Sequence, residues 1–297
     1  MGQGRTGHGP VTVVVPYPSG GASDVLGRVF ASFLAVQLGE PVIVDNRVGA
    51  GGTIGATHVA GSTPDGRTML LTLGNLLLNQ EFLLSGVKFR PLQALQPVAK
   101  TNDLRVAMVA NANHPAKDLV DFIAMAKRNP GKHSFAYYGD LGIVSMAIEA
   151  GIDLIRVPYK GGPPGLVDVA AGNVDLIASS LTQALPLLKG GKLKILAVMT
   201  AKRWVDYPNV PTVVEILPRY KAVDYQGIFL PSGTPKPVVD ALWKATAAVL
   251  ANPDYRRSVE DRGAIPDPLG PEDFKRYVTA DHANIKKIVE AAGIRAE

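Results

Sequence analysis

A glycine-rich segment, Pro16–Asp24, has the sequence PYPSGGASD and connects an apolar run to a helical pattern. A strand, a glycine turn and a helix start together present unpaired backbone N–H groups and the positive end of a helix dipole, which suits an anion. Gly20 and Gly21 would let a ligand carboxylate approach the main chain, and Ser23 adds a hydroxyl group. On spacing alone, a turn with only a structural role is an equal alternative.

A second glycine cluster lies between Asp45 and Ala56 and again leads from a strand into a helix. One interpretation is a second anion contact near the first. The favoured interpretation is a tight crossover, because Asp45 would repel an anion and Arg47 can pair with Asp45.

Two further segments follow apolar strands: VPYKGGPPG at Val157–Gly165 and SSLTQALP at Ser179–Pro186. Either segment could position a ligand. The tyrosines Tyr17, Tyr138 and Tyr159 could line a pocket, although partly buried packing explains a tyrosine at a strand end equally well.

Signatures of catalysis and of metal binding are scarce in this sequence. The histidines show no metal-ligand spacing and no H-E-x-x-H motif, so each is interpreted as a surface or capping residue; they are His8, His58, His114, His133 and His282. No G-x-S-x-G motif occurs, and Asp24 is interpreted as a helix cap. We therefore predict no catalytic residue, no metal and no cofactor.

Alternating strand and helix patterns predict parallel α/β units. The predicted strands are Val11–Val15, Val42–Val44, Thr68–Leu73, Ala107–Ala110, Ser134–Tyr137, Asp175–Ala178 and Ile195–Thr200. The predicted helices are Asp24–Leu38, Gly55–Ser62, Leu119–Lys127, Gly165–Ala171 and Val238–Leu250, with another helix opening at Ser179–Ser180. Turns are predicted at Pro231–Pro235 and Pro266–Pro268.

Composition sets limits on the class of protein. The 297 residues are 46% hydrophobic and 19% charged, which is typical of a folded protein of one large or two ordinary domains. The net charge is +5, but Lys and Arg are dispersed, so nucleic acid is not an expected partner. There is no cysteine, which excludes disulfides and thiolate chemistry. Residues 1–9 are interpreted as a flexible leader.

Seven motifs occur in the order found in one family of transport proteins. They are VPYPSGGASD, NRVGAGGTIGA, TPDGRTMLL, VPYKGGPPGLVDVAAGNVDL, GKLKILAVMTAKR, YPNVPTVVE and FLPSGTPKPVVDAL. In these motifs the chain resembles the Bug family, the substrate-binding proteins of tripartite tricarboxylate transporters, from about Val11 onward.

The resemblance implies an α/β, two-domain periplasmic-binding-protein fold of type II-like topology with a cleft between the domains. Domain 1 would comprise residues 10–107 and 226–297, and domain 2 residues 108–225, with two crossovers forming a hinge. The implied function is non-enzymatic capture of a small organic carboxylate in the periplasm and its delivery to membrane permease subunits by a monomer. The export signal is expected to have been removed from the chain.

The same resemblance carries over ligand-binding residues by position. They are Tyr17, Pro18, Gly20, Gly21, Ala22, Ser23 and Asp24 in the first loop, and Tyr138, Gly139, Ser145, Tyr159, Ser179 and Ser180 in domain 2. The sequence departs from the family pattern between Tyr138 and Gly151, where part of a loop or its helix is expected to be missing and Asp140 replaces a small hydroxyl residue. Ser179 also stands where many relatives have an acidic residue, which favours a plain carboxylate ligand over an amino acid.

Two alternatives remain from the residues themselves. An α/β enzyme could use the first glycine-rich loop as an oxyanion or phosphate cradle, although no convincing base or nucleophile accompanies it. A sensor or interaction protein with a reduced pocket is the other alternative.

Overall fold

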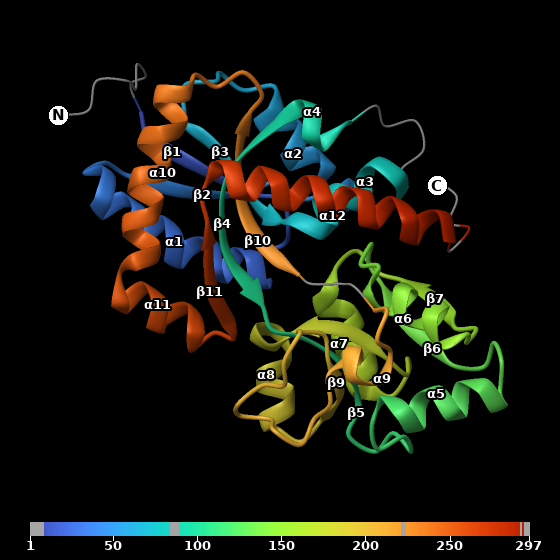
Figure 1. The fold of residues 1–297 in the computed structure, drawn as a ribbon. Helices are drawn as coiled ribbons and strands as arrows, with labels where there is room; N and C mark the ends of the chain where they lie inside the picture. The colour runs from blue at the N-terminus through green and yellow to red at the C-terminus, as the bar shows by residue number, and fades with distance from the viewer. Residues whose placement is uncertain (1–8, 84–88, 221–223, 292, 294–297) are drawn as a thin grey trace. The chain divides into compact units, whose positions relative to one another are not determined.

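A computed structural model of the chain describes residues 9–83, 89–220, 224–291 and 293 (Figure 1). The described residues form two compact units. The first unit consists of the described residues between 9 and 103 and between 225 and 286. The second unit consists of the described residues between 104 and 224 and between 287 and 293. No helix in the described ranges is both long enough and apolar enough to cross a membrane.

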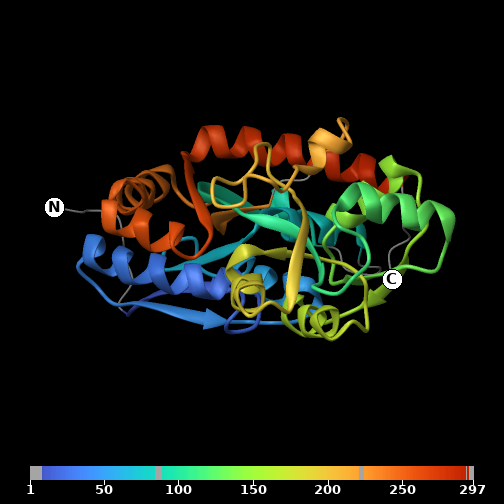
Figure 2. The ribbon, with the colours of Figure 1, turned by 90° about the horizontal axis from the view of Figure 1, so that it is seen from below.

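The first unit is built on a six-stranded sheet with the order β11-β4-β10-β3-β1-β2. Its strands are β1 (Val11–Val15), β2 (Val42–Asn46), β3 (Thr68–Leu73), β4 (Leu95–Leu104), β10 (Tyr225–Pro231) and β11 (Ala264–Leu269). β1 is parallel to β2 and β3, whereas β10 is antiparallel to β3 and β4. Figure 2 shows the blue β2 at one side of this unit and the red β11 away from it, in agreement with their places at opposite edges of the sheet.

The valines of β1 explain its place inside the sheet, between β3 and β2. All four are completely buried, and β-branched residues pack well on both faces of a covered parallel strand.

Helices cover this sheet. They are α1 (Ala22–Leu38), the 3-10 helix η1 (Ala50–Gly52), α2 (Thr53–Ala60), α3 (Gly74–Leu83), α4 (Pro91–Ala94), α10 (Lys236–Ala251), α11 (Pro253–Glu260) and α12 (Pro271–Ala291). In α1 the buried residues Leu26, Phe30 and Leu34 recur every four positions and form one apolar face. The ring of Phe30 meets that of Tyr255 in α11 edge to face. Figure 1 shows α10 and α11 in orange beside the blue α1, in agreement with the contacts among these helices.

The second unit contains a three-stranded sheet with the order β8-β5-β9 and a two-stranded sheet of β6 and β7. The strands are β5 (Val106–Asn111), β6 (Ser134–Tyr137), β7 (Ile155–Pro158), β8 (Ile177–Ser180) and β9 (Leu193–Val198). The helices are α5 (Leu119–Arg128), α6 (Gly142–Ala150), α7 (Gly162–Ala171), α8 (Leu181–Lys189) and α9 (Val213–Ile216). β6 and β7 are parallel, and a parallel bridge joins Phe135 to Leu176 just before β8.

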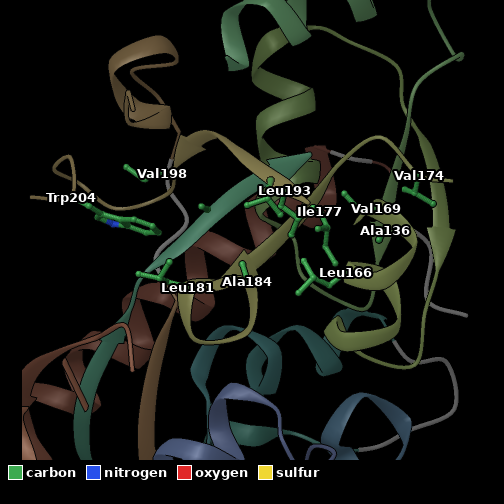
Figure 3. Close-up of a cluster of buried hydrophobic side chains, with 12 residues drawn as sticks. Ala136, Leu166, Val169, Val174, Ile177, Leu181, Ala184, Leu193, Val198 and Trp204 are labelled. Carbon is green, nitrogen blue, oxygen red and sulfur yellow. The ribbon is translucent and has the colours of Figure 1, made fainter. Parts of the chain in front are cut away.

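Apolar side chains from α7, α8 and the sheet fill the core of the second unit (Figure 3). Leu166 and Val169 on α7 pack with Ile177 of β8 and Leu193 of β9, and all four are buried. This core fixes α7 and α8 against the strands that precede them.

Several sequence predictions are confirmed. β1, β3 and β6 have the predicted bounds, and α1, α2, α5, α7 and α10 lie where helices were expected, with ends that differ by at most three residues. α1 ends at Gly39, whose φ of 67° and N–H bond to the Ala35 carbonyl form a left-handed cap. The turn predicted at residues 231–235 is also present, because the Thr234 N–H bonds to the Pro231 carbonyl.

Other predictions are wrong. The sheets are not parallel throughout, because β5, the strand predicted at Ala107–Ala110, is antiparallel to both β8 and β9, and β10 is antiparallel to β3 and β4. The helix predicted to open at Ser179–Ser180 is present, with Ser180 as its N-cap and Leu181 as its first residue, but both serines also end β8, which was not expected. Pro266 and Pro268 lie inside β11 and form no turn; a strand at the edge of a sheet tolerates proline because one side of its backbone needs no ladder bond.

The division into units also differs from the predicted domains. The predicted boundary between residues 107 and 108 would cut β5, whereas the units divide at 103/104, near the end of β4. The second division falls at 224/225. Residues 287–291 were predicted in domain 1 and group with the second unit.

Candidate functional site

Three helices begin at one edge of the first unit's sheet. β1, β2 and β3 run parallel, so their carboxyl ends meet at the same edge, and α1, η1 and α3 begin directly after them. The first N–H groups of a helix have no partner within the helix, and its dipole is positive at that end. The edge therefore favours a negatively charged group over a cation.

Tyr17 connects the three strand-to-helix segments. Its hydroxyl lies 3.0 Å from Thr72 Oγ1, at the end of β3. A Cβ added at Gly52 would lie 3.3 Å from Tyr17 Cε1 and 3.4 Å from Pro16 Cβ, so the second glycine cluster lies directly beside the first. The predicted pairing of Asp45 with Arg47 is also present, at 2.6 Å.

Asp24 stabilises the turn from inside the helix. Gly21 is the N-cap and α1 begins at Ala22, so the prediction that Asp24 caps the helix is wrong by three positions. Its carboxylate reaches back to accept the N–H of Gly20 at 2.9 Å, one residue before the N-cap, in an arrangement related to a capping box. Burial would raise the pKa of Asp24, but the bonds from Arg28 and Gly20 outweigh burial and lower it.

Asn46 holds the loop from the neighbouring strand. Its Nδ2 donates to the Tyr17 carbonyl at 3.1 Å, and its Oδ1 accepts from Ser19 Oγ at 3.1 Å and from Arg28 at 3.0 Å. Asn46 was not predicted to shape the first loop. The signal was its place at the end of the strand next to β1.

We expect Asn46→Ala to loosen this loop, because it removes three hydrogen bonds that hold residues 17–19 and Arg28. Hydrogen exchange in peptides covering residues 17–24 should become faster by about tenfold, the equivalent of one lost net hydrogen bond. Asn129→Ala in the second unit removes an exposed side-chain bond and serves as the control. Unchanged protection of residues 17–24 would show that Asn46 does not hold the loop.

Two buried hydroxyl groups at this edge lack a hydrogen-bond partner among the described residues. Ser23 Oγ lies in the first turn of α1 and Thr53 Oγ1 in the first turn of α2. Ser23 is only 2% exposed and Thr53 only 5%. Buried hydroxyl groups are usually paired in native proteins, so both retain the capacity to bond to an additional group.

The second unit has a comparable edge. β6, β7 and β8 run parallel, and α6, α7 and α8 begin after their carboxyl ends. The Tyr138 hydroxyl donates to the Ala178 carbonyl at 2.8 Å and links two of these ends. Gly139 lies in the same loop with a φ of 97°.

The other predicted residues of this edge differ in how their polar groups are used. The Tyr159 hydroxyl donates to Asp168 at 2.5 Å, which raises the pKa of Tyr159 to about 12. Ser179 Oγ bonds weakly to the Ser180 carbonyl at 3.4 Å, whereas Ser180 Oγ is buried without a partner among the described residues. Ser145 lies within the first turn of α6, where its N–H bonds to the Leu141 carbonyl.

The segment predicted to be shortened still holds a helix. α6 has nine residues and ends at Gly151 in a left-handed cap. Asp140 is buried before this helix and accepts the Gly142 N–H at 2.9 Å. Burial, with the charges of Asp140 and Asp224, raises the pKa of Tyr220 well above its usual value.

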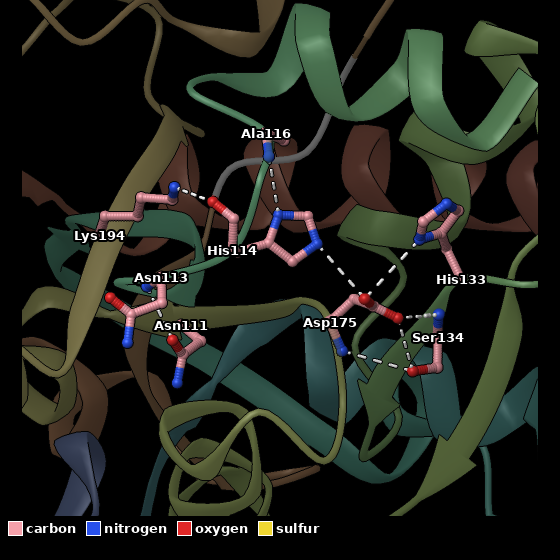
Figure 4. Close-up of polar contacts among 8 residues, drawn as sticks. All are labelled: Asn111, Asn113, His114, Ala116, His133, Ser134, Asp175 and Lys194. Carbon is pink, nitrogen blue, oxygen red and sulfur yellow. Dashed lines mark hydrogen bonds and ion pairs between the residues drawn. The ribbon is translucent and has the colours of Figure 1, made fainter.

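A cluster of His114, His133, Ser134 and Asp175 lies on another part of the second unit (Figure 4). Asp175 Oδ1 lies 3.3 Å from His114 Nε2 and 3.7 Å from His133 Nδ1, and Asp175 Oδ2 accepts from the Ser134 N–H at 2.8 Å. Both histidine side chains are largely buried, so the prediction of surface or capping histidines is wrong for them. His58 is exposed, as predicted; His8 lies outside the described residues.

The spacing of this cluster would admit a metal ion, but its hydrogen bonds point to another role. His114 Nδ1 accepts the Ala116 N–H at 3.2 Å, so a neutral ring carries its proton on Nε2 and donates it to Asp175. A metal would need that nitrogen without its proton. The cluster is also no catalytic triad, because the Ser134 hydroxyl bonds to Asp175 and not to a histidine.

Comparison with known proteins identifies the family. The model of the tripartite tricarboxylate transporter family receptor matches residues 26–294. The chain belongs to this receptor family. A curated relative of this receptor, the UPF0065 protein in the tcbD-tcbE intergenic region of Pseudomonas sp. (strain P51), is 33% identical over 86% of this chain and 77% of its own. Protein BugT of Bordetella pertussis is 29% identical over 96% of this chain and 90% of its own.

Solved structures resemble the receptor over nearly its whole length. Rpa4515 of R. palustris, determined with adipate, is 30% identical, covers 97% of this chain and 98% of its own, and has a TM-score of 0.89. The periplasmic binding protein BugD is 30% identical with a TM-score of 0.87, over 97% of this chain and 99% of its own. MatC of Rhodopseudomonas palustris, with bound malate, is 29% identical with a TM-score of 0.84, over 94% of this chain and 98% of its own. The receptor thus has the two-domain α/β fold of periplasmic binding proteins, as the sequence predicted.

Proposed function

We propose that the receptor binds a small organic carboxylate at the carboxyl edge of β1, β2 and β3. The observation that carries the proposal is the buried Ser23 hydroxyl, which lacks a partner among the described residues and lies in the first turn of α1. A ligand carboxylate placed there would accept the hydroxyl proton and the free N–H groups of that turn. Asp24 is paired with Arg28 at 2.9 Å, which reduces its repulsion of an anion.

Each predicted residue of the first loop has a part in this proposal. Gly20, with a φ of 82° and open space around it, and Gly21 allow the ligand to approach the main chain. Tyr17 and Pro18 shape the loop, and Ala22 and Ser23 begin the helix. The residues Tyr138, Gly139, Ser145, Tyr159, Ser179 and Ser180 of the second unit remain predictions as ligand contacts.

Similar proteins support the ligand class, because one was determined with adipate and another with malate. The family description supports delivery of the ligand to membrane permease subunits of a tripartite tricarboxylate transporter. We infer a periplasmic location from the periplasmic relatives. We also propose that the receptor is a monomer and that it carries out no reaction on its ligand.

A thermal-shift screen tests the proposal. The wild-type protein is heated with malate, succinate, adipate, citrate and benzoate, each beside its uncharged amide. A binding acid at 100 times its Kd should stabilise the fold by about 2.7 kcal/mol, and its amide should not. A panel in which no acid raises the melting temperature of the folded protein would contradict the proposal.

A further inference from the structure

The second glycine cluster has features beyond those of a tight crossover. Gly49, Ala50, Gly51 and Gly52 have φ angles of 131°, 46°, 61° and 100°. Ala50 has a positive φ without being glycine, a conformation that costs an L-residue free energy. Such a backbone fixes the start of α2, whose first residue is Thr53.

The polar side chain at this helix start, Thr53, has no hydrogen-bond partner in the part of the chain that the structure describes. Thr53 Oγ1 is buried, the residue is 5% exposed, and no described group bonds to the hydroxyl. By contrast, the equally buried Thr234 donates to the Pro231 carbonyl at 2.7 Å. A hydroxyl group shielded from water without a partner weakens a fold, so the Thr53 hydroxyl is suited to a partner outside the chain.

Thr53 also lies next to the proposed carboxylate loop. Gly52, immediately before it, packs against Tyr17, and a Cβ at Gly55 would lie 2.9 Å from Pro16 Cβ. β1 and β2 pair from Val11 with Val42 to Val15 with Asn46, so the segments that follow them begin level with each other. Among the residues that the structure describes, Thr53 and Ser23 are therefore two unpartnered hydroxyl residues of one strand edge.

The charged groups near this segment are already neutralised. Asp45 and Arg47 pair at 2.6 Å, and Arg47 also lies 3.2 Å from His58. What the segment offers is thus the uncharged hydroxyl group of Thr53, because the Thr53 N–H already bonds to the Ala50 carbonyl and the Ile54 N–H to the Gly49 carbonyl. A hydroxyl group bonds to an oxygen atom of a ligand, not to an apolar group.

We propose that Thr53 is a specificity-determining contact that bonds through Oγ1 to a second oxygen of the bound acid. This inference rests on the proposed carboxylate site and names a further residue and chemical requirement for it. The second oxygen belongs either to the carboxylate itself or to a hydroxyl group on the adjacent carbon. Malate and succinate distinguish the two sources, because they differ only in that hydroxyl.

Calorimetric titration of Thr53→Val with malate and succinate tests the proposal. Valine keeps the shape of threonine and removes only the hydroxyl. We expect a Kd about tenfold higher than that of the wild type, the size of one hydrogen bond to a charged group, and no loss of thermal stability in the ligand-free protein. A loss confined to malate assigns the second oxygen to the ligand hydroxyl, and a loss shared with succinate assigns it to the carboxylate.

Two further variants separate binding from folding. Thr53→Ser keeps the hydroxyl group and should bind like the wild type. Thr234→Val removes a partnered hydroxyl and should lower stability while leaving the Kd unchanged. A wild-type Kd in Thr53→Val, with or without lower stability, would overturn the proposal for Thr53. Failure of the wild type itself to bind any acid would instead contradict the carboxylate site.

Discussion

Gly74→Ala is expected to lower the free energy of unfolding by about 3 kcal/mol, the upper range for overpacking in a core. A Cβ at Gly74 would lie 2.0 Å from Tyr225 Cζ and 2.3 Å from its hydroxyl oxygen. Tyr225 is completely buried, and the centroid of its ring lies 4.9 Å from that of Tyr277 and 5.9 Å from that of Phe274. The tyrosine ring therefore has little room to move away. Urea unfolding measures the change.

Two comparisons make this prediction specific. Gly61→Ala meets nothing closer than 3.5 Å and should change stability little. Tyr225→Leu in the Gly74→Ala background removes the clashing ring and should make the cost of the alanine smaller than it is with tyrosine present. If Gly74→Ala unfolds at the same urea concentration as the wild type, the close packing of α3 against β10 is refuted.

Asp175→Asn is expected to destabilise the second unit by about 2 kcal/mol at pH 7, within the range for hydrogen bonds to charged groups. Burial would raise the pKa of Asp175, but bonds from His114 and from the Ser134 N–H and Oγ, with the charge of His133, hold it well below its usual value. The asparagine Nδ2 would face donors where the carboxylate accepts. The cluster would then lose its central acceptor.

The sign of the pH dependence follows from the lowered pKa. The folded state binds the Asp175 proton less tightly than the unfolded chain does, in which the pKa of an aspartate is about 3.9. The stabilisation is therefore fully present above pH 4 to 5 and is lost as the pH falls toward the lower folded value. Urea unfolding of wild type and variant should show the difference shrinking below pH 4. The exposed Asp153→Asn serves as the control, and a difference that does not change with pH would contradict the role of Asp175.

Local sequence patterns predicted the elements that carry the first loop. The valine run of β1, the apolar spacing of α1 and the terminating Gly39 are all signals that neighbouring residues supply. Strand direction is not such a signal, which is why the antiparallel pairing of β5 with β8 and β9 was not predicted. The prolines of β11 favour a turn when only their neighbours in sequence are considered. The strand tolerates them because it lies at the edge of the sheet.

The candidate site was likewise predictable where neighbouring residues encode it, and not where it depends on distant residues. The composition of the glycine-rich loop was enough to predict it as a candidate site. Asn46, by contrast, bonds to a residue 29 positions away. Thr53 lies in a glycine cluster that was interpreted as a tight crossover, so its own role was not predicted. His114 and Asp175 are 61 positions apart, so no short spacing could reveal their contact. Contacts of this kind depend on the register of distant strands, which single-sequence patterns do not specify.

Carboxylate binding at Ser23 is tested most directly by a calorimetric titration of the wild type and of Ser23→Ala with the acid that most raises the melting temperature. We expect a saturable one-to-one binding curve for the wild type and a Kd about tenfold higher for Ser23→Ala, because the variant loses a hydroxyl bond to the carboxylate. Equal Kd values in two folded proteins would contradict a carboxylate bound by Ser23 at the start of α1.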